Sequence, residues 1–66
     1  MTAAELKELN HKLSEDYKEL AKGFRSLSEK YFEQEDNPHS ELLSNIYKNI
    51  AERMFDISFI YAYIAG

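Results

Sequence analysis

The segment Glu35-Asp36-Asn37-Pro38-His39-Ser40 separates two parts of the sequence. In each part the apolar residues recur with the period of an α-helix. Asn37 is a favourable N-cap, and Pro38 suits the first position of the helix that follows. Proline also disfavours the α conformation in the residue before it, so a preceding helix has to end here. Ser40 is a competing N-cap, which leaves the start of the second helix open by about three residues. The segment therefore predicts a short turn between two helices.

Upstream of the turn, leucines recur every seven residues, and aromatic residues follow three of them at a distance of four. The two series are Leu6, Leu13, Leu20 and Leu27, and Tyr17, Phe24 and Tyr31. Spacings of three, four and seven place side chains on one stripe of a helix. Thr2 and Glu5 have the spacing of a capping box. We therefore expect a helix over about residues 3–35.

Downstream of the turn, a second apolar series has the same period. It consists of Leu43, Ile50, Ile57 and Ile64, with Ile46, Tyr47, Met54, Ile60 and Tyr61 beside them. This series predicts a helix over about residues 38–65, after a turn over about residues 36–39. A turn this short makes the two helices antiparallel. The expected fold is all-α, a single coiled-coil-like helical hairpin over residues 1–66, in which the leucine–aromatic stripe packs against the isoleucine-rich stripe.

Gly23 lies in the middle of the predicted first helix, where glycine is about 1 kcal/mol less favourable than alanine. Folding the chain at about residue 37 places Gly23 near Ala51 or Glu52. Two interpretations stay open. Either a close approach of the helices at Ala51 offsets the cost, or Gly23 is a tolerated weak point.

The composition limits how this hairpin can be stabilised. A chain of 66 residues buries only about 60% of the surface that its unfolded form exposes. The chain has no cysteine, which excludes disulfides and cysteine-based zinc sites and leaves a partner chain as the stabilising element. The net charge of −4 argues against nucleic-acid binding, which normally uses a basic surface.

The chain also lacks the patterns of export and membrane insertion. Its first residues have neither the basic nor the apolar region of a signal peptide. No apolar run approaches the ~20 residues needed to cross a bilayer. We therefore expect a cytoplasmic protein.

The last ten residues, 57–66, carry no charge and are apolar on nearly every side of the predicted helix. Phe55, Phe59 and Tyr63 step by four along a line that should face away from the first helix. A second apolar stripe of this kind is normally buried against another helix, another protein or a membrane. We expect a dedicated protein partner or a second copy of the chain, whereas a membrane-surface helix would need more basic residues. The predicted partner-binding residues are Phe55, Phe59, Tyr63, Ala62, Ile60, Ile64 and Met54.

Chemistry-bearing residues do not converge in the predicted hairpin. His11 lies on the outward face of the first helix, and His39 lies in the turn. No glycine-rich phosphate loop and no nucleophile elbow is present. We expect no enzyme, no catalytic residues, no metal and no cofactor.

The Met1-Thr2 start, the alanine- and isoleucine-rich stretch over residues 51–57 and the closing segment over residues 60–66 resemble a known family. In length and layout the whole chain is similar to the small co-chaperones of type III secretion needle subunits, the YscE type. The resemblance implies a cytoplasmic, virulence-associated co-chaperone. Such a protein pairs with a tetratricopeptide-like second chaperone and keeps a needle subunit unpolymerised.

Two other helical hairpins are alternatives. The Asn37-Pro38 turn resembles that of needle subunits themselves, which polymerise. A Rop-like dimer, in which two hairpins form a four-helix bundle, has the same layout. The acidic charge balance argues against the RNA binding of that dimer.

Overall fold

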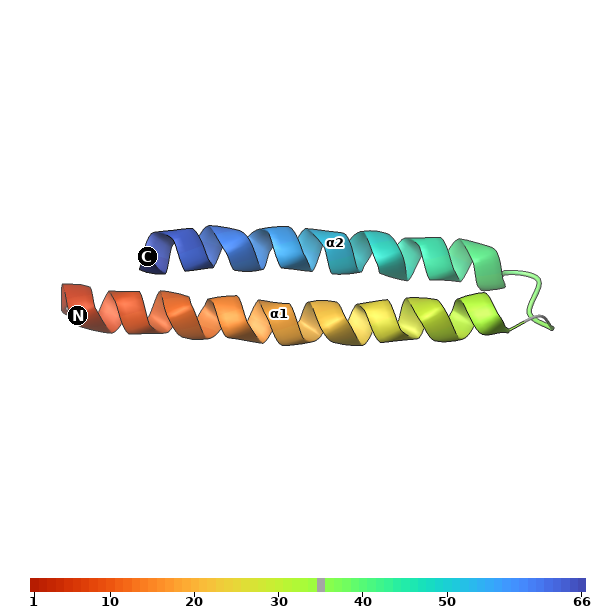
Figure 1. Ribbon diagram of the computed structural model, residues 1–66, viewed down its shortest axis with the longest axis horizontal. Helices are drawn as coiled ribbons and strands as arrows, with labels where there is room; N and C mark the ends of the chain where they lie inside the picture. Colours follow the sequence, from red (N-terminus) through yellow and green to blue (C-terminus); the bar gives the residue numbers. More distant parts are fainter. Residues whose placement is uncertain (35) are drawn as a thin grey trace.

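The computed structural model describes residues 1–34 and 36–66, and its regular elements are two helices. Helix α1 runs over Ala3–Glu33 and α2 over Ser40–Ala65. The helices lie side by side and antiparallel, and the N-terminal end of α1 extends beyond the end of α2 (Figure 1). The Cα atoms fill a rod of 53 × 14 × 12 Å. The predicted all-α two-helix hairpin is confirmed.

The start of α1 follows from its capping residues. The Thr2 hydroxyl accepts a hydrogen bond from the main-chain N–H of Glu5 at 3.1 Å, and it donates one to the Glu5 carboxylate at 3.1 Å. The carboxylate is thereby held beside the helix N-terminus, where negative charge is favourable. The predicted N-cap is confirmed. The predicted helix end at residue 35 lies outside the described residues; the described helix ends at Glu33.

The start of α2 differs from the prediction by two residues. The side-chain oxygen of Asn37 accepts from the N–H of His39 at 2.9 Å, and the main-chain carbonyl of Asn37 accepts from Ser40 at 3.0 Å. Asn37 thus closes a local turn instead of capping a helix that begins at Pro38. The carbonyl of His39 accepts the first helical hydrogen bond, from Leu43, at 2.9 Å. The helix therefore begins at Ser40.

The helices meet along a seam of small residues. Every buried residue in the described chain is serine or alanine, and these residues recur at intervals of seven. The seam consists of Ser14, Ala21 and Ser28 on α1, and of Ser44, Ala51, Ser58 and Ala65 on α2. The predicted contact between the two apolar stripes is present through their aromatic residues, but its centre is the seam of small residues and not the leucine and isoleucine rows. Those rows flank the seam, because the small side chains occupy the line of contact.

Hydrogen bonds cross this seam at two levels. The Ser14 hydroxyl donates to the main-chain carbonyl of Ser58 at 2.8 Å, and the Ser28 hydroxyl donates to the carbonyl of Ser44 at 2.7 Å. A side chain as short as serine reaches the opposite backbone only where the helices approach closely. The bonds also satisfy hydroxyl groups that burial would otherwise leave unpaired. In the described residues no buried side-chain polar atom lacks a partner.

Gly23 does not lie on the seam. A Cβ atom built at Gly23 meets nothing within 4 Å, whereas Ala21, two residues earlier in α1, is fully buried. The interpretation of Gly23 as a point of close approach to Ala51 was wrong. Within the helix pair, Gly23 is a position where a side chain has room.

A search of the described residues finds no helix with the length and apolar character needed to cross a membrane.

Candidate protein-interaction face

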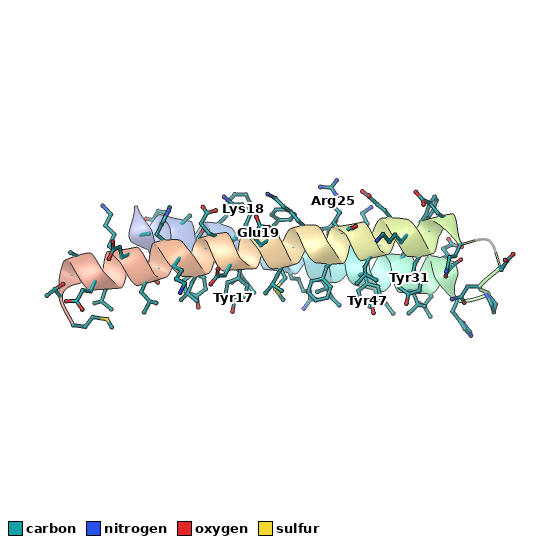
Figure 2. The ribbon with its side chains drawn as sticks, turned by 90° about the horizontal axis from the view of Figure 1, so that it is seen from below. Tyr17, Lys18, Glu19, Arg25, Tyr31 and Tyr47 are labelled. Carbon is teal, nitrogen blue, oxygen red and sulfur yellow. The ribbon has the colours of Figure 1, made fainter. Side chains whose placement is uncertain are left out.

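The hairpin has two unlike faces because most of its large apolar residues lie on the same side of the seam in both helices. We call this side the apolar face. It is made of four rows with a seven-residue spacing: Leu6, Leu13, Leu20 and Leu27; Tyr17, Phe24 and Tyr31; Tyr47, Met54 and Tyr61; and Leu43, Ile50, Ile57 and Ile64. Figure 2 shows Tyr17, Tyr31 and Tyr47 on one side of the hairpin, with Lys18 and Arg25 on the other.

Stacked aromatic rings join the helices along the inner rows of the apolar face. Tyr17 of α1 lies on Tyr61 of α2 with ring centroids 5.5 Å apart and an angle of 9° between the planes. Tyr47 lies between Phe24 and Tyr31, at centroid distances of 6.1 and 5.6 Å. Offset stacking of this kind contributes about 0.5–1.5 kcal/mol per pair beyond the burial of area. These rings stay half-buried, as expected for aromatic residues at the edge of the helix contact.

The outer, aliphatic rows of the apolar face are incompletely covered. Leu20 is 53% exposed and Ile64 is 56% exposed, and Leu6 and Leu27 are also exposed. Apolar residues that are exposed singly are common on protein surfaces, but a contiguous face of this size marks an interaction site. By contrast, the buried apolar residues of the described chain are three alanines. The hairpin therefore leaves these leucines of α1 and Ile64 of α2 available to another surface.

The opposite face is polar over α1, and we call it the charged face. Its ion pairs are local, with Lys18 3.7 Å from Glu15 and Lys22 3.5 Å from Glu19. These groups are substantially exposed, so each pair contributes at most a few tenths of a kcal/mol. The charged face thus resembles an ordinary solvated helix surface.

A shallow, open hollow lies at the outer edge of the apolar face at Gly23. It is lined by Leu20, Gly23, Phe24 and Leu27, with Glu19 at one side. The hollow exists because glycine stands in a row that otherwise carries Leu9, Asp16 and Lys30 at intervals of seven. This row, together with Ile46, Arg53 and Ile60 on the far edge of α2, forms the rim of the apolar face.

The structure divides the predicted partner-binding residues between the two faces. Met54 and Ile64 belong to the apolar face, and Ile60 lies on its rim. Phe55 lies instead over a small hollow beside Arg25 and Lys48 on the charged face.

The other predicted residues also lie away from the apolar face. Ala62 lines a hollow with Ala4 and His11 at the open end of the hairpin. Phe59 and Tyr63 point into solvent, and Tyr63 is 87% exposed. The predicted set is therefore not one continuous surface.

The predicted line of Phe55, Phe59 and Tyr63 has few apolar neighbours on α1. The positions that α1 presents on that side are mostly charged, such as Lys18 and Arg25. Sequence reasoning missed Leu6, Leu20 and Leu27 as surface residues, because it assigned them to the helix contact. The signal that identifies them is the heptad of small residues, Ser14-Ala21-Ser28, one position after each leucine of the series from Leu13.

The described residues contain no group of three or more histidine, aspartate or glutamate side chains placed to hold a metal ion. His11 lies at the open end of the hairpin and His39 at the turn. These histidines therefore do not form part of one site.

No family model, no characterised protein and no solved structure matches this chain. The inference of function consequently depends on the geometry of the hairpin.

Proposed function

We propose that this chain is a protein–protein interaction module that uses the apolar face to cover a helical surface of another polypeptide. The observation that carries the proposal is the contiguous apolar face, two helices wide, whose outer rows the hairpin leaves exposed. Apolar stripes at helical spacing are recognised by complementary stripes or grooves on other helices. Covering such surfaces is the work of a small chaperone or co-chaperone.

The resemblance to needle-subunit co-chaperones gives this proposal a specific form. In that form the chain is cytoplasmic, a tetratricopeptide-like chaperone contacts the hairpin, and the client is a needle subunit kept from polymerising. The apolar face supports this version because an isolated amphipathic subunit needs an apolar surface to cover it. The alternative is a self-associating four-helix bundle of structural or regulatory role. The same face supports it.

Neighbouring residues of α2 provide a matched test of the interaction face. Ile60 is on the rim of the apolar face and Phe59 is on the charged side, yet their exposures are almost equal, at 59% and 63%. Ile60→Asp therefore places a charge at the apolar face, and Phe59→Asp places the same charge on the same helix at a comparably exposed site. Leu20→Asp places the same charge on the apolar face from the other helix, α1.

The experiment is native capture of each tagged variant from the source cells, with quantification of every co-eluting chain, including untagged copies of this chain. Circular dichroism establishes that each variant keeps its helical content. We expect the original sequence and Phe59→Asp to retain a stoichiometric associate, and Ile60→Asp and Leu20→Asp to lose it. Retention by all four, absence of any associate of the original sequence, or loss only in Phe59→Asp would contradict the proposal.

A further inference from the structure

We propose that the occupant of the apolar face is a second copy of this chain, packed face to face so that α1 of each hairpin lies on α2 of the other. This inference rests on the proposed function of the face and names its partner. The resulting assembly is a four-helix bundle with a two-fold axis along the length of the hairpins.

The size of the apolar face suits a stable dimer. The two helices lie side by side over α2, whose 26 residues span about 39 Å, and together they are roughly 20 Å wide, so the face covers about 800 Å². A specific protein interface of standard size uses about 800 Å² of each partner. One hairpin therefore offers another the whole area that a stable dimer needs.

The rows of the face match under this symmetry. The seam places Ser14 level with Ser58 and Ser28 level with Ser44. A two-fold axis along the hairpin leaves these levels unchanged when α1 is placed on α2 of the other copy. Leu13 then lies about half a helical turn from the level of Ile57 in the other copy, an offset at which the side chains of antiparallel helices interdigitate. The same holds along the whole leucine row.

The rims are complementary in charge and in shape. In this arrangement Asp16 lies within one helical turn of Arg53 of the other copy, and symmetry forms the pair twice. The hollow at Gly23 lies within one helical turn of Ile46 of the other copy. The isoleucine side chain is exposed in the single hairpin and is apolar, like the lining of the hollow. A knob in a hole is the ordinary packing unit of helical bundles.

The other face-to-face arrangement, with α1 on α1, is less favourable. A two-fold axis through the level of Gly23 would place Asp16 near Lys30 of the other copy, which also pairs opposite charges. It would set the two glycine hollows against each other, however, and leave a void between the hairpins. Voids forfeit packing contacts, so the arrangement of α1 on α2 is preferred.

Charge exchange at the rim tests both the partner and the arrangement, because these residues are exposed and their replacement leaves the seam intact. Sedimentation equilibrium of the purified chain should give the mass of two copies. Asp16→Arg and Arg53→Asp should each weaken dimerisation about ten-fold, since each breaks two symmetric ion pairs. The double variant Asp16→Arg/Arg53→Asp should restore the original dissociation constant.

The following results would overturn the inference. A chain that stays monomeric throughout the micromolar range would refute the second copy as occupant of the face. Single charge reversals without effect would show that the rim does not face Arg53 of a second copy. If Asp16→Arg/Lys30→Asp restored dimerisation and Asp16→Arg/Arg53→Asp did not, the hairpins would pack with α1 on α1. A monomeric chain whose capture of another protein is lost in Ile60→Asp would refute the second copy and leave the proposed function standing.

Discussion

Ser14 of α1 donates a hydrogen bond at 2.8 Å to the main-chain carbonyl of Ser58 of α2, and Ser58 is itself fully buried. This contact between residues 44 positions apart in the sequence sets the distance and register of the helices. Together with the other buried serine and alanine residues, it shows that the helices meet through short side chains, so that the large apolar residues remain beside the contact. The apolar face is exposed because serine and alanine, and not the large apolar residues, occupy the contact between the helices.

Ser14→Ala tests the contribution of the hydroxyl alone, because alanine fits the space that serine occupies. We expect the free energy of unfolding to fall by about 0.5–1.5 kcal/mol, the usual net value of one hydrogen bond. Urea denaturation at fixed chain concentration measures the change. Asn10→Ala is a suitable control, since its side chain bonds only within α1, to the carbonyl of Leu6. A loss at Ser14 no larger than the loss at Asn10 would contradict a stabilising seam.

Ala21→Leu tests how closely the helices approach. Ala21 is fully buried opposite Ala51, and a leucine at this level has to push the helices apart. Overpacking of this kind costs typically about 1–3 kcal/mol. Leucine is otherwise a good helix former, so the loss cannot come from propensity. An Ala21→Leu hairpin as stable as the original by thermal denaturation would show that the leucine and isoleucine rows, and not the seam, lie between the helices.

Tyr47→Leu tests the aromatic stack, because it keeps an apolar side chain and removes two ring contacts at once. We expect a loss of about 1 kcal/mol for each stacked pair and a reduced near-ultraviolet circular dichroism signal from tyrosine. Tyr63→Leu is the control, since Tyr63 is exposed and in the described structure its ring makes no aromatic contact. Equal effects of the two substitutions would argue that the stack does not stabilise the hairpin.

Gly23→Ala should stabilise the chain. The added methyl group meets nothing within 4 Å, and alanine in place of glycine inside a helix contributes up to about 1 kcal/mol. Gly23→Leu, in contrast, fills the hollow, so we expect it to weaken dimerisation as measured by sedimentation. An alanine variant less stable than the original would show that residue 23 is tightly enclosed.

Sequence reasoning predicted the hairpin because the signals that determine it are local. The Asn37-Pro38 turn, the Thr2 cap and the two apolar series depend on neighbouring residues. The start of α1 and both ends of α2 agree with the prediction to within about two residues, the usual uncertainty of helix ends. The expectation that so short a chain buries only part of its surface agrees with a buried set limited to serine and alanine.

The rotation of each helix about its axis could not be predicted in the same way. Both a large-residue stripe and a small-residue stripe repeat every seven residues, and they lie side by side on each helix. Burial of area favours turning the leucines inward, whereas close approach and the serine hydrogen bonds favour turning them aside. The choice depends on whether another surface covers Leu20 and Ile64, and the spacing of residues within one helix does not show whether such a surface is present. The predicted site therefore mixed residues of two faces.

Hydroxyl-radical footprinting of the associated and dissociated chain is the most direct test of which face is covered, because it needs no substitution. It compares each residue with itself in the two states, and adjacent residues of α2 report on opposite sides of the hairpin. We predict that labelling of Leu20, Ile60 and Ile64 falls on association, while labelling of Phe59 and Tyr63 stays unchanged. Protection of Phe59 and Tyr63 with undiminished labelling of Leu20 and Ile64 would contradict the account.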